Sequence, residues 1–443
     1  MKEKVILTLH FLRMRFYTIN SFTLYFTSKP IELAVFPILV QFMLVRFLTI
    51  SISFFLIFAS TLGLNANANE LQRLNKQLAA DFAKELKKHN IPGGAYAIVK
   101  NNKVIALEKF GYIDTKKSKK VDNNTVFRLA SVSRPFAATI TTMLAQEQQL
   151  NLSDPITKYL PNFTLATKGA ADKIQIKHLL SHSSGLMPNA YDNLLHENWS
   201  MEKIINRFDR VKPICQPAKC YGYQNIVYGF LQPAIEASQT KSYSTLLQER
   251  IFSPLEMENA SVGIDVFRNN KNTAKPHILR KRIKTGRKDK QGNDIIKYVW
   301  RTVDVEPDYY KVAPAAGINA SITDLAKWLI ANLGYQPTVL SPALLDELTT
   351  PRIKTKKDLR RRYWRSHLTD AHYGYGWRIY QFGEHPIVYH SGWVAGFRAD
   401  IGYSPDLDIG FAVLINAESN VINKITSQFW SKAHKKLLAK VKI

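Results

Sequence analysis

Cysteine and acidic side chains are scarce in this sequence. Its 443 residues include two cysteines, Cys215 and Cys220, so at most one internal disulfide can form and the cysteines alone cannot build a four-ligand metal site. Asp and Glu together number 35 against 61 Lys and Arg, which gives a formal net charge of +26. A positive excess of this size favours contact with an anionic partner, such as nucleic acid, phospholipid or an acidic cell-wall polymer.

The remaining composition is ordinary for a globular protein. Hydrophobic residues make up 46% of the chain, charged residues 22% and aromatic residues 11%. These proportions exclude a disordered chain, a collagen-like fibre and a small disulfide scaffold. The length is sufficient for one large domain or for two or three of average size.

A stretch of 18 residues without a charge, Phe47–Leu64, lies near the start of the chain. Arg46 precedes this stretch, and the small-residue pattern Ala66-Asn67-Ala68 follows it. A positive residue, an apolar run and an A-x-A pattern in this order are typical of a secretory signal peptide. Residues 1–68 are therefore predicted to be an upstream extension and a signal peptide, and residues 69–443 to be one domain that is exported to the periplasm.

Two alternatives stay open for this leader. Met43 lies just before Arg46 and can start a compact signal peptide, so that residues 1–42 are an extension that is never translated. The apolar stretch can also be an uncleaved membrane anchor, because its 18 residues are near the lower limit for a spanning helix. Under either reading the rest of the chain lies outside the cytoplasm.

An oxidising compartment favours a disulfide between the two cysteines. A bridge between Cys215 and Cys220 closes a tight loop that holds Gln216-Pro217-Ala218-Lys219. Two free thiols are the alternative.

The apolar pattern changes its period twice along the chain. Glu70–Lys88 has leucine and phenylalanine at helical spacing, and Ala95–Lys100 with Lys103–Lys109 predicts a β-hairpin. From residue 131 to about 345 the pattern is mostly helical. Strands return at Gly376–Phe382, Pro386–His390, Gly396–Ser404 and Ile409–Asn416, before a final helix from Ser419 or Asn420 to about Val441. This order predicts an α/β fold in which both chain ends contribute to one antiparallel sheet flanked by helices, with an all-helical subdomain inserted between them.

Three segments carry most of the positive charge. Two of them, Arg268–Arg301 and Arg352–Arg365, lack apolar periodicity and are predicted to be surface loops, and the third is the end of the C-terminal helix. They are either solvated surface or a docking site for an anionic cell envelope. Specific nucleic-acid binding is not expected, because no reader fold is recognisable and export removes that partner.

Ser131 lies within Phe127–Arg134, just before a run with helical spacing. At a helix N-terminus, free N–H groups and the helix dipole stabilise a developing oxyanion. Residue 134 is one turn further along and faces the same site. In serine hydrolases with an S-x-x-K motif this residue is a lysine that assists removal of the serine proton. Taken alone, the pattern also fits an ordinary helix-capping serine.

Five segments in this order resemble the serine β-lactamase family, especially the class C β-lactamases and the related D-alanyl-D-alanine carboxypeptidases and esterases. These segments are Phe127–Arg134, His178–Leu186, Tyr223–Asn225 with Tyr228-Gly229, Ala315–Ser321 with Asp324–Ala326, and His390–Gly392. The resemblance covers nearly all of the chain beyond residue 68. It implies an α/β sandwich with a helical subdomain, an active site in the cleft between them, a monomer and no cofactor. It implies as substrates β-lactams, D-Ala-D-Ala peptides or small esters.

The same resemblance implies roles for individual residues. Ser131 corresponds to the acyl-forming nucleophile, Tyr223 to the group that shuttles the proton, and Asn225 to the side chain that binds the substrate amide. His390-Ser391-Gly392 stands where many relatives have K-T-G, so His390 is expected to supply the positive charge or the proton of that lysine. The backbone N–H groups of Ser131 and Trp393 are expected to form the oxyanion hole beside Gly392. The alternative is that Tyr223 and His390 are packed side chains without a catalytic role.

Arg134 departs from the pattern of the family. Arginine stays protonated and cannot act as a general base, although it can place positive charge beside Ser131 and Tyr223. Three interpretations follow: a slow enzyme with Tyr223 as base, an enzyme for activated esters, or a non-catalytic protein that binds a peptidoglycan fragment. His178 and His182 are interpreted as structural, and no metal is expected because no third ligand lies near them.

Overall fold

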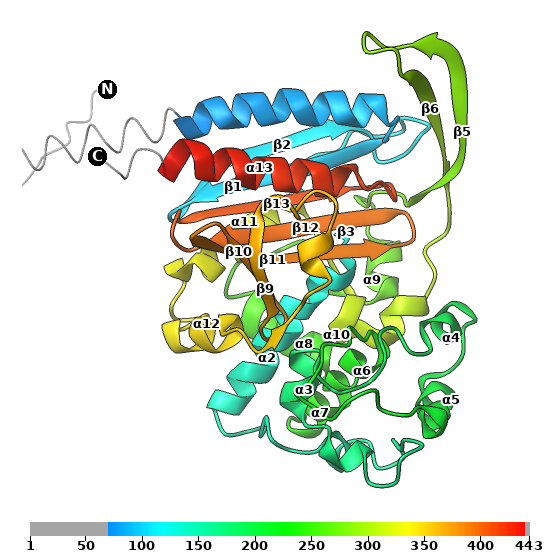
Figure 1. Ribbon diagram of the computed structural model, residues 1–443, viewed down its shortest axis with the longest axis vertical. Coiled ribbons are helices and arrows are strands. Elements are labelled where there is room, and N and C mark those ends of the chain that lie inside the picture. The colour runs from blue at the N-terminus through cyan, green and yellow to red at the C-terminus, as the bar shows by residue number, and fades with distance from the viewer. Residues whose placement is uncertain (1–69, 439–443) are drawn as a thin grey trace, which may run out of the picture. The chain divides into compact units, whose positions relative to one another are not determined.

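The computed structural model describes residues 70–438, which form an eight-stranded sheet packed between helices (Figure 1). The strands follow the order β2-β1-β13-β12-β11-β10-β9-β8, and every neighbouring pair is antiparallel. Their bounds are β1 Gly93–Lys100, β2 Lys103–Gly111, β8 Ile353–Lys354, β9 Leu368–Tyr373, β10 Arg378–Phe382, β11 His385–Val394, β12 Phe397–Ser404 and β13 Ile409–Ile415. The sheet thus joins strands from both ends of the described chain, which confirms the predicted fold class.

Two helices cover one face of this sheet. The N-terminal helix, residues 70–88 (blue in Figure 1), buries the predicted apolar face that includes Leu74 and Phe82. The other helix is α13, Val421–Leu438, whose Phe429 stacks on Phe411 of β13 with ring centres 4.2 Å apart. The predicted end of α13 near Val441 lies outside the described residues. No helix within residues 70–438 is both long and apolar enough to cross a bilayer.

The opposite face packs against the central helices. Helix α11, Ile322–Ile330, contacts β1 and β13, and its Trp328 stacks on Phe136 of α2, Ser133–Gln146, with ring centres 4.1 Å apart. The inserted region is mostly helical, as predicted. Its longer elements are α3 Ile176–Leu180, α4 Asp192–His196, α5 Met201–Asn206, α6 Ile226–Gly229, α7 Leu231–Ala237, α8 Tyr243–Leu247, α9 Ile264–Asn269, α10 Ala313–Ala316 and α12 Pro342–Thr349. A small sheet of β3 Phe127–Arg128, β7 Ile318–Ala320 and β4 Ser261–Val262 connects this region to the nucleophile segment.

The prediction of a surface loop over Arg268–Arg301 is wrong. Most of this segment forms a two-stranded ribbon, β5 His277–Lys288 and β6 Asp294–Thr302, which extends beyond the sheet (Figure 1). Both faces of its outer half are exposed, so no buried stripe imposes the alternation that identifies a strand in a sequence. The segment Arg352–Arg365 is also not a plain loop, because it contains β8 and the fully buried Trp364.

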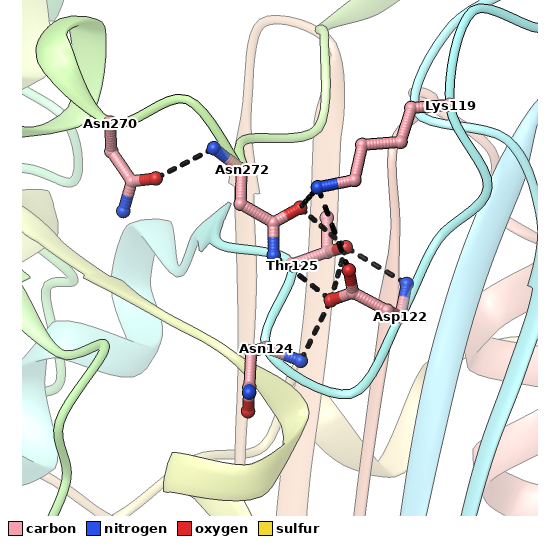
Figure 2. A network of polar contacts seen from close by, with 6 residues as sticks. All are labelled: Lys119, Asp122, Asn124, Thr125, Asn270 and Asn272. Atoms are coloured by element: carbon pink, nitrogen blue, oxygen red, sulfur yellow. Dashed lines mark hydrogen bonds and ion pairs between the residues drawn. The ribbon is translucent and has the colours of Figure 1, made fainter.

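A polar network fixes the segment that leads into this ribbon (Figure 2). The carboxylate of Asp122 accepts hydrogen bonds from the Asn272 amide at 2.9 Å, from the Thr125 hydroxyl at 3.0 Å and from the Asn124 backbone N–H at 3.0 Å. Lys119 donates to the Asn272 side-chain oxygen at 2.8 Å. The loop after β2 therefore holds the base of the β5–β6 ribbon.

Candidate active site

Ser131 lies in a 3-10 turn, Ala130–Val132, that leads directly into α2. Ala130 has a φ of 51°, in the left-handed region that few side chains favour. The turn lies against β11, where a Cβ on Gly392 would meet the Leu129 carbonyl oxygen at 2.1 Å. The glycine therefore lets the nucleophile segment approach the strand closely.

The side chain of Ser131 lines a polar cavity of about 320 Å³ between the sheet and the helical region. The lining residues are Ser131, Asn189, Asp192, Tyr223, Asn225, Tyr309, Ala316, Arg361, Arg378, Ser391, Gly392, Trp393 and Arg398. Five of the residues predicted from the sequence thus meet in one place. The other two, Arg134 and His390, lie behind the wall of the cavity with side chains that are fully buried.

Arg134 is a buried cation held by neutral acceptors. Its Nη1 donates to the Ala315 carbonyl at 2.7 Å, and its Nη2 donates to the Gln224 carbonyl at 3.2 Å and to the Asn225 side-chain oxygen at 2.5 Å. Its Nε donates to Nε2 of His182 at 3.2 Å. Within residues 70–438 no carboxylate lies at ion-pair distance from it, so its charge remains uncompensated next to the cavity.

Asn225 connects this cation to the acidic side of the cavity. While its oxygen accepts from Arg134, its nitrogen donates to the Asp192 carboxylate at 2.5 Å. Burial raises the pKa of Asp192, against the lowering effect of the hydrogen bond from Asn225. Hydrogen bonds at both its oxygen and its nitrogen thus orient the amide of Asn225. A substrate that binds this amide must do so alongside Arg134 and Asp192.

Tyr223 lies between two guanidinium groups. Its ring centre is 4.3 Å from the guanidinium carbon of Arg134 and 5.4 Å from that of Arg378, and 4.2 Å from the ring centre of His182. Cation–π contacts of this kind fix the ring and place positive charge against its face. A tyrosine that accepts a proton needs such charge nearby.

The segment that presents Tyr223 is held by a disulfide and by a turn of the helical region. Cys215 and Cys220 are bonded, as predicted. Inside the bridged loop the Ala218 N–H donates to the Ser183 carbonyl at 2.8 Å, and beyond it the Gly222 N–H donates to the His182 carbonyl at 2.8 Å. The position of Tyr223 therefore depends on covalent and backbone contacts just before it.

The interpretation of His182 as purely structural is incomplete. This side chain is buried against both Arg134 and Tyr223, and burial, followed by the charge of Arg134, lowers its pKa well below the ordinary value. It is therefore neutral and can accept the hydrogen bond from arginine. His178 is structural: its ring accepts from the Gln175 N–H at the start of α3.

His390 is predicted to supply the positive charge or the proton of the family's lysine, and its surroundings disfavour the charge. Its ring lies fully inside the protein, with Nε2 at 2.9 Å from the Tyr373 hydroxyl and Nδ1 at 3.0 Å from the Ser391 carbonyl. Burial, and then the charges of Arg378 and Arg134, lower its pKa well below the ordinary value, so the imidazole is neutral. Arg378, on the neighbouring strand β10, carries charge in this part of the site and pairs with Asp358.

Arg398 is a further cavity residue that was not predicted from the sequence. It lies opposite Trp393 across β11 and β12, is 9% exposed, and its buried Nε has no hydrogen-bond acceptor within the described part of the chain. Asp400, two residues along β12, is fully buried, and burial raises its pKa to about 6. The sequence did contain a signal for these site residues: Arg398 and Asp400 are two charged residues in an otherwise mostly apolar strand, and buried charges need a partner or a function.

Comparisons with known proteins agree with this geometry. A family model described as Beta-lactamase matches residues 78–428. The chain is 25% identical over 353 residues to the Protein flp of Staphylococcus aureus (strain MRSA252), which covers 79% of this chain and 64% of that protein. It is 22% identical over 377 residues to a beta-lactamase of Escherichia coli (strain K12), covering 78% and 89% of the two chains. This chain thus spans slightly less than two thirds of the length of the flp relatives.

A solved structure shares the architecture. It is that of the octameric penicillin-binding protein homologue from Pyrococcus abyssi, which superposes with a TM-score of 0.63 and 25% sequence identity. The match covers 77% of this chain and 73% of the other. The two chains therefore share their overall fold.

Proposed function

The chain belongs to the Beta-lactamase family, and from this premise we propose that it is a serine hydrolase that forms an acyl-enzyme at Ser131. The observation that carries the proposal is the meeting of Ser131, Tyr223, Asn225 and the edge of β11 at one cavity. Strand β10 stops pairing with β11 at Tyr389, so one edge of residues 390–394 is free of strand partners on that side. An edge of this kind suits a carbonyl compound that must bind beside the nucleophile.

In the proposed reaction the Ser131 hydroxyl oxygen bonds to the substrate carbonyl carbon, and Tyr223, reacting as its phenolate, accepts the hydroxyl proton. The N–H groups of Ser131 and Trp393 hold the negative oxygen that forms. The bond to the leaving group then breaks, and Tyr223 returns the proton to that group. In the second step a water oxygen bonds to the acyl carbonyl carbon while the Tyr223 phenolate accepts the water proton. The bond from that carbon to the Ser131 oxygen then breaks, and Tyr223 returns the proton to Ser131.

The buried Arg134 restricts the substrates. Because it cannot accept a proton, Tyr223 acts without a second base, and general-base help is worth roughly 100- to 10,000-fold in rate. Activated carbonyls, such as strained β-lactams and esters with good leaving groups, depend least on that help. The unpaired Arg398 supports substrates that also carry an anionic group.

A non-catalytic binding protein is the second candidate. It is favoured by the four neutral acceptors that hold Arg134 rigidly where a base would be needed. Such a protein would bind a peptidoglycan fragment in the same cavity without turnover.

Covalent labelling separates the two candidates. A fluorophosphonate or penicillin probe should add its mass to Ser131 in the folded chain, and Ser131→Ala should remain unlabelled. Folded protein that binds a penicillin reversibly, yet never acquires the added mass, would contradict the hydrolase and support the binder.

We also propose that the protein is exported to the periplasm, with a membrane anchor as the alternative. The leader pattern ending at Ala68 and the disulfide support this location. The N-terminus of protein isolated from cells should begin near Asn69. An intact apolar stretch 47–64 in membrane-bound material would favour the anchor instead.

A further inference from the structure

Positive charge gathers on the face of the sheet that the N-terminal helix and α13 cover. The β5–β6 ribbon, with its turn, carries nine Lys or Arg residues against two Asp, and α13 carries four lysines and no acidic residue. The ribbon joins this face at the end of the N-terminal helix, where the indole N–H of Trp300 donates to the His89 carbonyl at 2.8 Å. Lys432 of α13 pairs with Asp81 of the N-terminal helix at 2.8 Å. The three elements therefore adjoin one another. We call their combined surface the basic face, because Lys and Arg outnumber Asp and Glu in it even though Lys424 and Lys432 are paired with carboxylates.

A polar cavity of about 390 Å³ opens where these elements meet. Lys88, Arg282 and Arg362 line it from three different segments, and none of them pairs with a carboxylate within residues 70–438. A fourth cation in its wall, Lys424, is neutralised by Glu85 at 2.6 Å. The wall also contains Glu418, whose carboxylate accepts from the Gly396 N–H at 3.0 Å. Four Lys or Arg side chains against Glu85 and Glu418 leave the lining with a net charge of 4 − 2 = +2, which attracts an anion with several oxygen acceptors.

We propose that this cavity binds the phosphate group of an anionic phospholipid, and that the basic face around it docks the protein on a membrane surface. Two guanidinium groups and one ammonium group match the oxygens of a phosphate. Clusters of four to eight basic residues are typical of anionic-lipid binding, which the potential of the surrounding lipids strengthens.

The ribbon identifies lipid rather than a hydrated polymer as the partner. Ile283 and Ile295 are 37% and 42% exposed on its outer half. Ile283 pairs with Lys297, so the two isoleucines share one face, opposite to the face of Arg282 and Tyr298. A ribbon that enters the headgroup layer presents both faces to lipid, where apolar side chains beside lysines are favourable.

Docking in this way leaves the candidate active site accessible. The turn of Ser131 packs against β11 and β12 on the side of the sheet that faces α2, whereas α13 packs on the other side. The inference therefore does not depend on the proposed hydrolase.

Vesicle binding of the full chain tests the proposal. We compare phosphatidylcholine vesicles with vesicles that also contain phosphatidylglycerol, over a range of salt concentrations. An apolar leader, if retained, binds both kinds of vesicle alike, so the ratio of the two affinities reports the basic face. The unmodified chain should prefer the anionic vesicles, and the preference should fall with salt because the Debye length shrinks from about 10 Å at 0.1 M to about 3 Å at 1 M.

Matched variants locate the effect. The triple variant Lys88→Gln, Arg282→Gln and Arg362→Gln should reduce the preference at least tenfold, because each lost charge weakens the attraction to the anionic surface. The control, Lys168→Gln, Lys173→Gln and Lys203→Gln, removes the same charge from exposed sites of the helical region and should retain the preference. Equal losses in both variants, or no preference in the unmodified chain, would overturn the proposal.

An uncharged change distinguishes lipid from an anionic wall polymer. Ile283→Ser with Ile295→Ser keeps the net charge, and it should weaken binding to anionic vesicles several-fold. Unchanged vesicle binding in this variant, together with tight binding to a soluble anionic polymer, would assign the face to the polymer and overturn the lipid proposal.

Discussion

At position 134 the difference between lysine and arginine is both chemical and structural. The guanidinium of Arg134 reaches four acceptors in different directions, including the Ala315 carbonyl and Nε2 of His182. A single ammonium group cannot reach all of them, yet it can give up a proton, which arginine cannot. Compared with lysine, arginine at position 134 therefore lacks the ability to act as a base, but it provides a rigid, charged support.

Arg134→Lys tests this exchange. The rate of hydrolysis of a chromogenic β-lactam or ester, per folded molecule, should rise by about tenfold or more. Thermal or denaturant unfolding should show a loss of about 1–3 kcal/mol, because buried acceptors lose their donors. Adding Ser131→Ala should remove the gain in rate. An unchanged or lower rate would mean that the cavity is built around arginine, as in the binding protein.

Arg398 is expected to select substrates by charge. Because its guanidinium is nearly buried and lines the cavity, and its Nε has no acceptor in the described structure, an anionic group of a substrate gives it a partner. Arg398→Gln should raise KM for an anionic chromogenic substrate at least tenfold and leave KM for a neutral ester within about twofold. Equal changes for both substrates would argue for a purely structural arginine.

Among the elements, the disulfide loop before Tyr223 links stability to the site. The Cys215–Cys220 bridge closes a short loop whose Ala218 N–H is bonded to the turn at Ser183. Cys215→Ser with Cys220→Ser should cost about 2 kcal/mol of unfolding free energy. It should also lower labelling of Ser131 more than the unfolded fraction explains, since Tyr223 loses its support. Labelling that falls only with the folded fraction would contradict a positioning role.

The elements that could be predicted from sequence are those whose apolar residues recur at a regular spacing. The N-terminal helix and the hairpin of β1 and β2 follow directly from their apolar spacing. The β5–β6 ribbon could not be found this way. Its outer half is exposed to solvent on both faces, so its apolar residues show no regular spacing.

The residues of the site divide in a similar way. Ser131, Tyr223 and Asn225 belong to local motifs, so sequence order sufficed to find them. Arg378 and Arg398 reach the cavity only through the pairing of β10, β11 and β12, a property of the folded sheet rather than of any short segment. The neutrality of His390 depends likewise on burial beside Tyr373, to which no local pattern points.

At the scale of the whole molecule, Asp400 couples stability to pH. Its folded-state pKa of about 6 lies above the ordinary value of 3.8 because the carboxyl is buried. The folded protein therefore holds this proton where the unfolded chain has lost it, so the contribution to stability is complete below about pH 4 and is lost as the pH rises through 6.

Comparison with Asp400→Asn isolates this contribution. The unfolding free energy of the unmodified protein minus that of the variant should fall by about 3 kcal/mol between pH 4 and pH 7, two pKa units at about 1.4 kcal/mol each. Denaturant titrations at several pH values measure it. A difference that is constant with pH would mean that Asp400 ionises as readily in the folded protein as in the unfolded chain.

The pairing of β1 with β13 also determines when the protein can fold. Gly94 lies beside Ile415, more than 300 residues away along the chain, so this pair of strands cannot form on a ribosome that has made only the first part. Contacts between such distant segments make folding slow, because a large loop must close before they can stabilise it. In an unfinished chain β1 therefore lacks its partner β13 until the last strands have been synthesised. In the proposed export, that delay leaves the main sheet incomplete while the polypeptide passes through a narrow translocation channel.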